Sequence, residues 1–95
     1  APAAAEGELA AFLHRAKLDP NRSEQAFERA IAADPKDANT LGNFSNFLWK
    51  ERRDLDRAEG MYERAIAADP KHATNLSDFA SFLRKERPDL SRGRT

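Results

Sequence analysis

The sequence repeats itself at an offset of 35 residues, and this periodicity constrains the fold more than any other feature. Residues 27–36 read FERAIAADPK, and residues 62–71 read YERAIAADPK. The correspondence continues from ANTLGNFSNFLWKERRDLDR (38–57) to ATNLSDFASFLRKERPDLSR (73–92). Because a fixed period of this length is typical of repeat architectures, we expect a single domain over 1–95. It would contain repeat 1 at about 3–37, repeat 2 at about 38–72 and a partial repeat 3 at about 73–95.

Each repeat has the pattern of two helices. In repeat 2, the apolar residues Leu41, Phe44 and Leu48 are three and four positions apart, which favours an amphipathic helix over a strand. Asp54 is the expected N-cap of a second helix, because its carboxylate can accept from unpaired backbone N–H groups. That helix should end before Pro70, since the residue preceding a proline avoids the α conformation. The pattern predicts an all-α chain of about five helices.

The repeat resembles the tetratricopeptide repeat, a helix-turn-helix unit with a period of about 34 residues. The resemblance rests on large and small positions at matching places: Leu41, Phe44, Ser45 and Leu48 on the first helix, and Ala58, Tyr62, Ala65 and Asp69-Pro70 on the second. The extra residue, in the turn near Lys50 to Arg53, and Leu41 in place of the family's tryptophan mark a divergent variant. The resemblance implies a right-handed α-solenoid of antiparallel helix pairs that serves as a protein-interaction scaffold.

Gly60 interrupts the second helix of repeat 2. Glycine inside a helix costs about 1 kcal/mol relative to alanine. Crowding against a neighbouring element is the one reason for a glycine there that the sequence suggests.

In arrays of this kind the first helix of each pair lines a concave face. The candidate partner-binding residues on that face are Asn39, Asn43, Asn46, Trp49, Lys50, Ser81, Arg84 and Lys85. Asparagine amides both donate and accept hydrogen bonds, which suits an extended peptide, and a tryptophan is a common interface anchor. Two alternatives remain open: the asparagines are ordinary solvated positions, and Trp49 packs on the next repeat or simply lies on the surface.

Some tetratricopeptide proteins bind the acidic tails of chaperones through two lysines, two asparagines and one arginine. In this chain Gly7 and Ala11 occupy the places of the first lysine and asparagine, and Thr74 and Asp78 those of the last lysine and arginine. Asn43 alone fits that set. The resemblance therefore does not support a chaperone acidic-tail partner.

The charge balance argues against a nucleic-acid binder held by bulk positive charge, because 16 basic residues are matched by 16 acidic ones. Basic residues do gather near the ends of the first helices: Arg15 and Lys17; Lys50, Arg52 and Arg53; Arg84, Lys85 and Arg87. Cations at a helix C-terminus favour the helix dipole, which explains this basic ridge without a ligand. Binding of RNA or another polyanion along it is the least favoured hypothesis.

The residues that most catalytic and metal sites need are missing or scattered. The chain has no cysteine, and its two histidines, His14 and His72, occupy non-equivalent places in different repeats. We therefore expect no metal, no cofactor and no enzymatic activity. No apolar run approaches the roughly 20 residues that span a bilayer, so we expect no membrane partner and a cytoplasmic location.

The leading hypothesis is a non-catalytic scaffold that binds a partner peptide or helix in the concave groove. The alternative is a structural or self-association module of a longer repeat array, with Phe82 and its apolar neighbours mediating contact between chains. The expected state is a monomer or a weak homo-oligomer formed through the C-terminal helix. Whether the array continues or a partner chain covers that helix stays open at this point.

Overall fold

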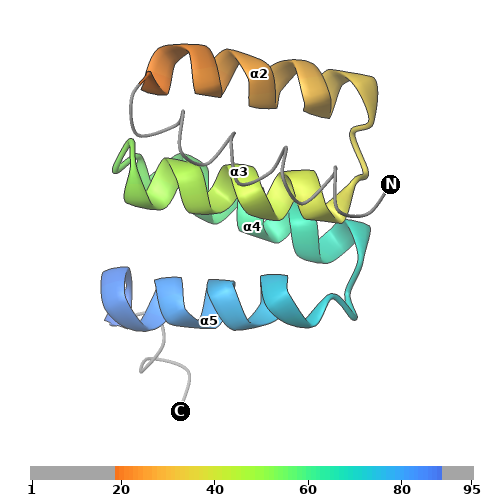
Figure 1. The fold of residues 1–95 in the computed structure, drawn as a ribbon. Helices are drawn as coiled ribbons and strands as arrows, with labels where there is room; N and C mark the ends of the chain where they lie inside the picture. Colours follow the sequence, from red (N-terminus) through yellow and green to blue (C-terminus); the bar gives the residue numbers. More distant parts are fainter. Residues whose placement is uncertain (1–18, 89–95) are drawn as a thin grey trace, which may run out of the picture.

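A computed structural model describes residues 19–88, and every regular element in this range is helical. The helices are α2 (Pro20–Ala33), α3 (Ala38–Lys50), α4 (Leu55–Ala68) and α5 (Ala73–Glu86), shown in Figure 1. The all-α prediction is confirmed for this range. It holds four helices, whereas the sequence predicts about five for the whole chain. The expected first helix of repeat 1, and the part of repeat 3 after residue 88, lie outside the described residues.

The helix boundaries follow the 35-residue offset. Helix α4 begins 35 residues after α2, at Leu55 and Pro20, and α5 begins 35 residues after α3, at Ala73 and Ala38. The N-cap predicted at Asp54 is confirmed, because its carboxylate accepts from the Arg57 backbone N–H. Helix α4 also ends before Pro70, as predicted.

The turn between α3 and α4 contains a residue with a left-handed backbone. Arg53 in this turn has a φ of 54°, the one positive φ at a non-glycine residue among those described. Such a left-handed conformation brings Cβ close to the following carbonyl and is unfavourable for most side chains. The Asp54 N–H closes the turn by donating to the Leu48 carbonyl oxygen at 2.9 Å.

The core repeats the same aromatic packing twice. Two clusters of three rings are related by the offset: Phe27, Phe44 and Phe47 between α2 and α3, and Tyr62, Phe79 and Phe82 between α4 and α5. The Phe27 centroid lies 5.2 and 5.3 Å from its two partners, and the Tyr62 centroid lies 5.3 and 5.4 Å from its own. These separations are in the favourable range for aromatic pairs.

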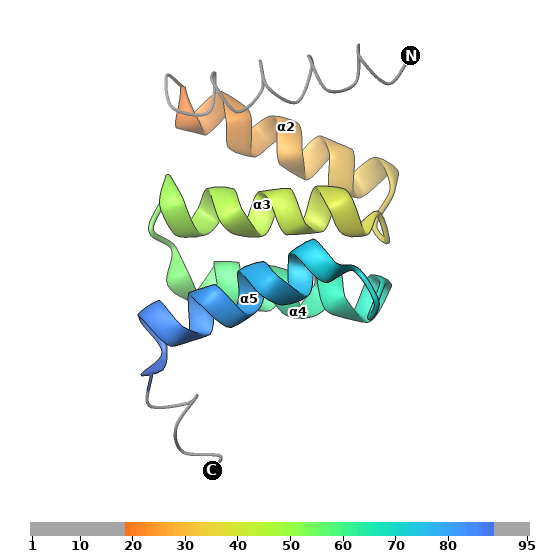
Figure 2. The same cartoon turned by 60° about the horizontal axis from the view of Figure 1, so that its bottom comes forward.

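Helix α3 is the centre of the arrangement. It packs against α2, α4 and α5, and α5 packs in turn against α4. In Figure 1, α3 lies between α2 and α5 while α4 lies behind it, and Figure 2 shows α5 and α4 at the other side of α3 from α2. Among residues 19–88, no helix combines the length and the apolarity needed to cross a lipid bilayer.

The two glycines of the described helices have opposite surroundings. A Cβ built on Gly42 would lie 1.9 Å from the Asn75 Oδ1 atom, so Gly42 allows α5 to approach α3 closely. A Cβ built on Gly60 would meet nothing within 4 Å. The crowding expected at Gly60 is therefore not observed, because no neighbouring element comes near that position.

Candidate interaction surface

Polar side chains recur along α3 and α5, at helical spacing and at the 35-residue offset. We call this surface the α3–α5 face and define it by Asn39, Asn43, Asn46 and Lys50 in α3 with Asp78, Ser81 and Lys85 in α5. The two helices are in contact. The face therefore brings together seven side chains, six of them predicted from the sequence.

Asn46 links three helices through its amide. Its Oδ1 atom accepts from the Tyr62 hydroxyl, and its Nδ2 atom donates to Asp78 Oδ2 at 2.9 Å. Burial raises the pKa of the Tyr62 phenol, and the Asp78 carboxylate raises it further. A large share of the hydrogen-bonding capacity that a peptide would need from Asn46 is thus used inside the molecule.

Asn39 is joined to the start of α5 by His72. The His72 Nδ1 atom accepts from the Asn75 backbone N–H, so His72 serves as the N-cap of the helix. The hydrogen therefore resides on Nε2, which donates to Asn39 Oδ1 at 2.6 Å. Asn39 itself is exposed. The contact with His72 uses only its Oδ1 atom, so its amide nitrogen can still donate hydrogen bonds.

Asn75 is a structural residue that the sequence did not single out. Its side chain is buried and donates to the Ala38 carbonyl oxygen at 2.9 Å. The signal that could have found it is Gly42, since a glycine in a helix often marks a close approach. Gly42 and Asn75 together fix the distance between the N-terminal halves of α3 and α5.

Trp49 is a core residue, which corrects its expected role as an exposed anchor. Its side chain is only 5% exposed, and its ring meets Phe82 edge-on at 5.4 Å. The indole Nε1 donates to Glu86 Oε2 at 2.8 Å. Packing on the next repeat, the alternative to the anchor, is the arrangement observed, because α5 lies directly against this end of α3.

Glu86 receives two kinds of donor at this junction. The Arg53 guanidinium contacts both of its oxygens, at 3.0 and 3.3 Å, and Trp49 donates to one of them. Hydrogen bonds from Arg53 and then from Trp49 lower the pKa of Glu86 below its ordinary value. The carboxylate thereby stays ionised and ties the α3–α4 turn to the end of α5.

Lys50 and Lys85 are exposed and converge on the same indole ring. The Lys50 Nζ atom lies 5.1 Å from the Trp49 ring centroid, and the Lys85 Nζ atom lies 5.9 Å from it. The two ammonium groups therefore lie within 11.0 Å of each other. Cation–π attraction holds both side chains near the ring while leaving their N–H groups accessible to solvent.

The other predicted residues lie beside this pair or further along the face. Ser81 is half-buried, and its hydroxyl oxygen accepts from the exposed Arg84 at 3.5 Å. Asn43 is also half-buried and lies one turn from Asn39 and Asn46. Asn43, Ser81 and Arg84 are thus still partly available to a partner.

Three arginines of the predicted basic ridge are paired with acidic neighbours. Arg52 contacts Glu24 at 3.1 Å, and Arg87 contacts Glu59 at 3.0 Å. These two ion pairs are equivalent at the 35-residue offset. Arg53 is paired with Glu86. Arg15 and Lys17, also assigned to the ridge, lie outside the described residues.

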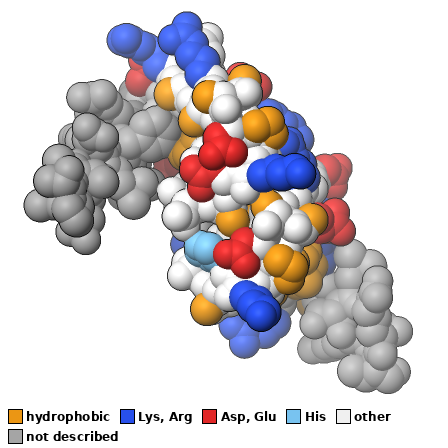
Figure 3. All heavy atoms as spheres, turned by 90° about the vertical axis from the view of Figure 1, so that its right-hand side faces the viewer, with side chains coloured by type: hydrophobic (Ala, Val, Ile, Leu, Met, Phe, Trp, Pro, Cys, Tyr) orange, Lys and Arg blue, Asp and Glu red, His pale blue; other side chains and the backbone are white. Residues whose placement is uncertain are grey.

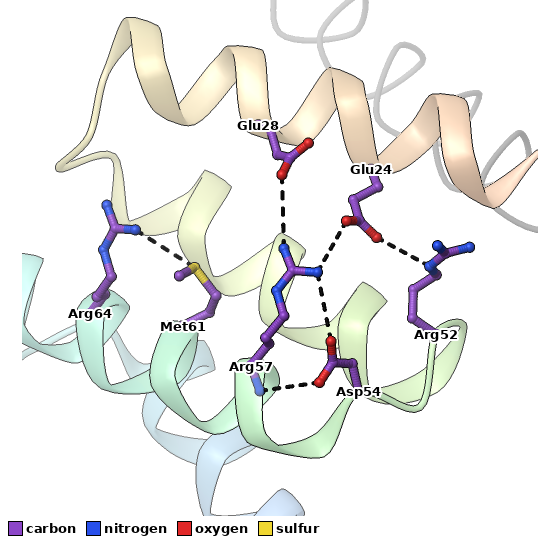
Figure 4. A network of polar contacts seen from close by, with 7 residues as sticks. All are labelled: Glu24, Glu28, Arg52, Asp54, Arg57, Met61 and Arg64. Carbon is purple, nitrogen blue, oxygen red and sulfur yellow. Dashed lines mark hydrogen bonds and ion pairs between the residues drawn. The ribbon is translucent and has the colours of Figure 1, made fainter.

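The pairing at Glu24 is part of a larger network between α2 and α4, drawn in Figure 4. Arg57 contacts Glu24 at 3.0 Å, Asp54 at 3.6 Å and Glu28 at 3.9 Å. The hydrogen bond to Glu24 is the main cause that raises the pKa of Arg57. This network ties α2 to the start of α4, so its charges serve the fold.

The end of the molecule that carries the α2–α3 and α4–α5 turns shows acidic and basic side chains interspersed (Figure 3). It presents neither a broad patch of one sign nor a large apolar area. Among residues 19–88, no group of three or more histidine, aspartate or glutamate side chains is placed to share a metal ion.

Phe82 does not lie on the surface, contrary to the self-association hypothesis. Its side chain is 0% exposed, because it packs between Trp49 and Tyr62. The one large hydrophobic side chain of the described range that is exposed is Leu76, at 42%. An apolar contact of α5 with another chain would therefore use Leu76 rather than Phe82.

Comparison of the chain with protein-family models, curated proteins and solved structures finds no match in any of the three. The resemblance to tetratricopeptide repeats and the function it implies stay predictions, which rest on the internal repeat of this chain.

Proposed function

We propose that this chain is a non-catalytic interaction scaffold that binds a segment of a partner protein along the α3–α5 face. The observation that supports it most is the convergence of Lys50 and Lys85 on Trp49 with both ammonium groups exposed. Two exposed cations beside the same ring suit carboxylate groups of the partner. Asn43 and Ser81, further along the face, offer donors and acceptors to a peptide backbone.

This proposal assigns direct partner contacts to fewer residues than the sequence suggested. Trp49 has an indirect role, because its ring positions the two lysines. Asn46 also has an indirect role, because it joins α3 to α5. The direct contacts are assigned to Asn39, Asn43, Lys50, Ser81, Arg84 and Lys85. The right-handed solenoid arrangement implied by the resemblance would make this the concave face.

A polyanion is the weaker candidate for the same face. Arg52, Arg53 and Arg87 are engaged by carboxylates. Few cations are then left to follow a nucleic-acid backbone, which is bound through many phosphate contacts.

The test is capture of a partner from nuclease-treated source lysate by the full chain. The variant removes the lysine pair, Lys50→Ala with Lys85→Ala. The matched control is Lys36→Ala with Lys71→Ala, which removes two exposed lysines that are also related by the 35-residue offset. Thermal melting by circular dichroism verifies that both variants fold.

We expect the wild type and the control to capture the same protein and the lysine-pair variant to retain it at least about tenfold less. Equal capture by all three proteins would contradict a site at the lysine pair. Capture that appears only when nuclease is omitted, and weakens steeply with salt, would favour the polyanion.

A further inference from the structure

Helix α5 repeats α3 in sequence, but its equivalent apolar face is not equally buried. On α3, three positions are almost fully buried: Leu41 at 1%, Phe44 at 2% and Leu48 at 0% exposure. The residues 35 positions later on α5 are Leu76, Phe79 and Leu83. Leu76 is 42% exposed, and the other two are only half-buried.

The difference has an identifiable cause, which is α4. This helix packs along α3 and buries its own small-large-small series, Ala58, Tyr62 and Ala65, against the core. The small residues allow the two helices to approach closely. Among residues 19–88, no helix occupies the corresponding place beside α5, which is the last helix of the stack in Figures 1 and 2.

The charges around this place are arranged as they are where α4 docks. Glu24 of α2 uses Oε1 for Arg52 and Oε2 for Arg57, the arginine in the first turns of α4. Its equivalent, Glu59 of α4, uses Oε1 for Arg87 at 3.0 Å. Within the described residues, the Glu59 Oε2 atom has no cation partner. An arginine at the start of a docked helix would complete the pattern.

We propose that the open α4–α5 face, defined by Leu76, Phe79, Leu83 and Glu59, binds an amphipathic helix of a partner protein. The occupant has an aromatic residue with an alanine-sized residue four positions before it and another three positions after it, as in α4. It carries an arginine directly before the first small residue, placed for Glu59. This surface is separate from the lysine pair and does not depend on it.

The test uses a peptide with the sequence of residues 54–68, DLDRAEGMYERAIAA, added to the full chain. The peptide contains no tryptophan and the chain contains one, so tryptophan emission comes only from Trp49. Anisotropy of a labelled peptide measures affinity, and amide chemical shifts of the chain locate the contact. We expect saturable binding with the largest shifts on α5.

Three substitutions define the contact. In the chain, Leu76→Lys is expected to weaken binding at least about tenfold, and it is tolerated by the fold because Leu76 is exposed. In the peptide, Tyr62→Ala is expected to weaken it by a similar factor. Glu59→Gln in the chain should weaken the unmodified peptide but have little effect on a peptide that carries Arg57→Gln.

A chain with Lys50→Ala and Lys85→Ala serves as the control and should bind the peptide like the wild type. No saturable binding, or binding that ignores Leu76→Lys, would overturn the proposal. So would sedimentation showing a dimer of the chain alone that Leu76→Lys abolishes, because the occupant would then be a second copy.

Discussion

The surroundings of Gly42 and Gly60 predict opposite effects of a glycine-to-alanine substitution on the free energy of unfolding. At Gly60 the space is open and φ is not positive, so Gly60→Ala should raise the free energy of unfolding by about 1 kcal/mol. Gly42→Ala would press on the buried Asn75 and disturb its bond to the Ala38 carbonyl. A loss of about 1–3 kcal/mol is expected there. Urea denaturation measures both, and destabilisation by Gly60→Ala would contradict the open space.

Tyr62 is the only tyrosine of the chain, and its burial predicts a loss of stability in alkali. Its folded-state pKa is raised above the ordinary 10.0, so folding disfavours the phenolate. The contribution is fully present below about pH 10 and is lost as the pH rises above that value.

Tyr62→Phe removes the titrating group. The variant should be less stable at neutral pH by about 1 kcal/mol, because Asn46 Oδ1 loses its donor. Its free energy of unfolding should fall less than that of the wild type between about pH 9 and pH 11. Parallel curves for the two proteins over that range would argue against a buried phenol.

At the scale of elements, the α3–α4 turn depends on the left-handed backbone of Arg53. Proline cannot adopt a φ of 54°, so Arg53→Pro should lower the free energy of unfolding by about 3 kcal/mol or more. Arg53→Gly relieves the conformational cost while losing the ion pair with Glu86, and should change stability by less than about 1 kcal/mol. Thermal or urea denaturation separates them, and a well-tolerated proline would refute the left-handed turn.

The equivalent of Arg53 in repeat 3 is Pro88. Residue 88 therefore cannot adopt the left-handed backbone of Arg53, even though the surrounding sequence repeats. A repeated sequence pattern thus does not ensure that each connection between helices has the same geometry.

At the scale of the whole molecule, the network around Glu24 joins α2 to α4. Glu24→Gln breaks contacts to both Arg52 and Arg57, and should cost about 1 kcal/mol at low salt. The cost should shrink toward zero near 1 M salt, where charges are screened within about 3 Å. Glu63→Gln is the matched control, since Glu63 is exposed and makes no ion pair with any residue in 19–88. A salt-independent loss would indicate packing rather than charge.

The two proposed surfaces differ in the chemistry of their side chains. The α3–α5 face is polar and carries a lysine pair, whereas the α4–α5 face is apolar with a carboxylate at its edge. Both depend on α5, because it completes the first surface and leaves the second open. Variants at Lys50 and Lys85 should therefore separate from variants at Leu76 in any binding assay.

The sequence by itself determined where the helices begin and end. Capping aspartates, prolines and apolar spacing act within a few residues, so the N-cap at Asp54 and the end before Pro70 could be predicted without knowledge of the fold. The same local logic predicted the all-α class and which residues lie along α3 and α5.

Only the tertiary structure decided which of those side chains stay exposed. Trp49 and Asn46 are among the predicted partner-binding residues of α3. In the structure α5 packs against them, and both donate hydrogen bonds to carboxylates of α5. Phe82 became core and Leu76 exposed for the same reason, although both are apolar positions of one amphipathic helix. Exposure depends on the neighbouring helices, such as α3 and α4 around Phe82, and periodicity alone carries no information about their exact placement.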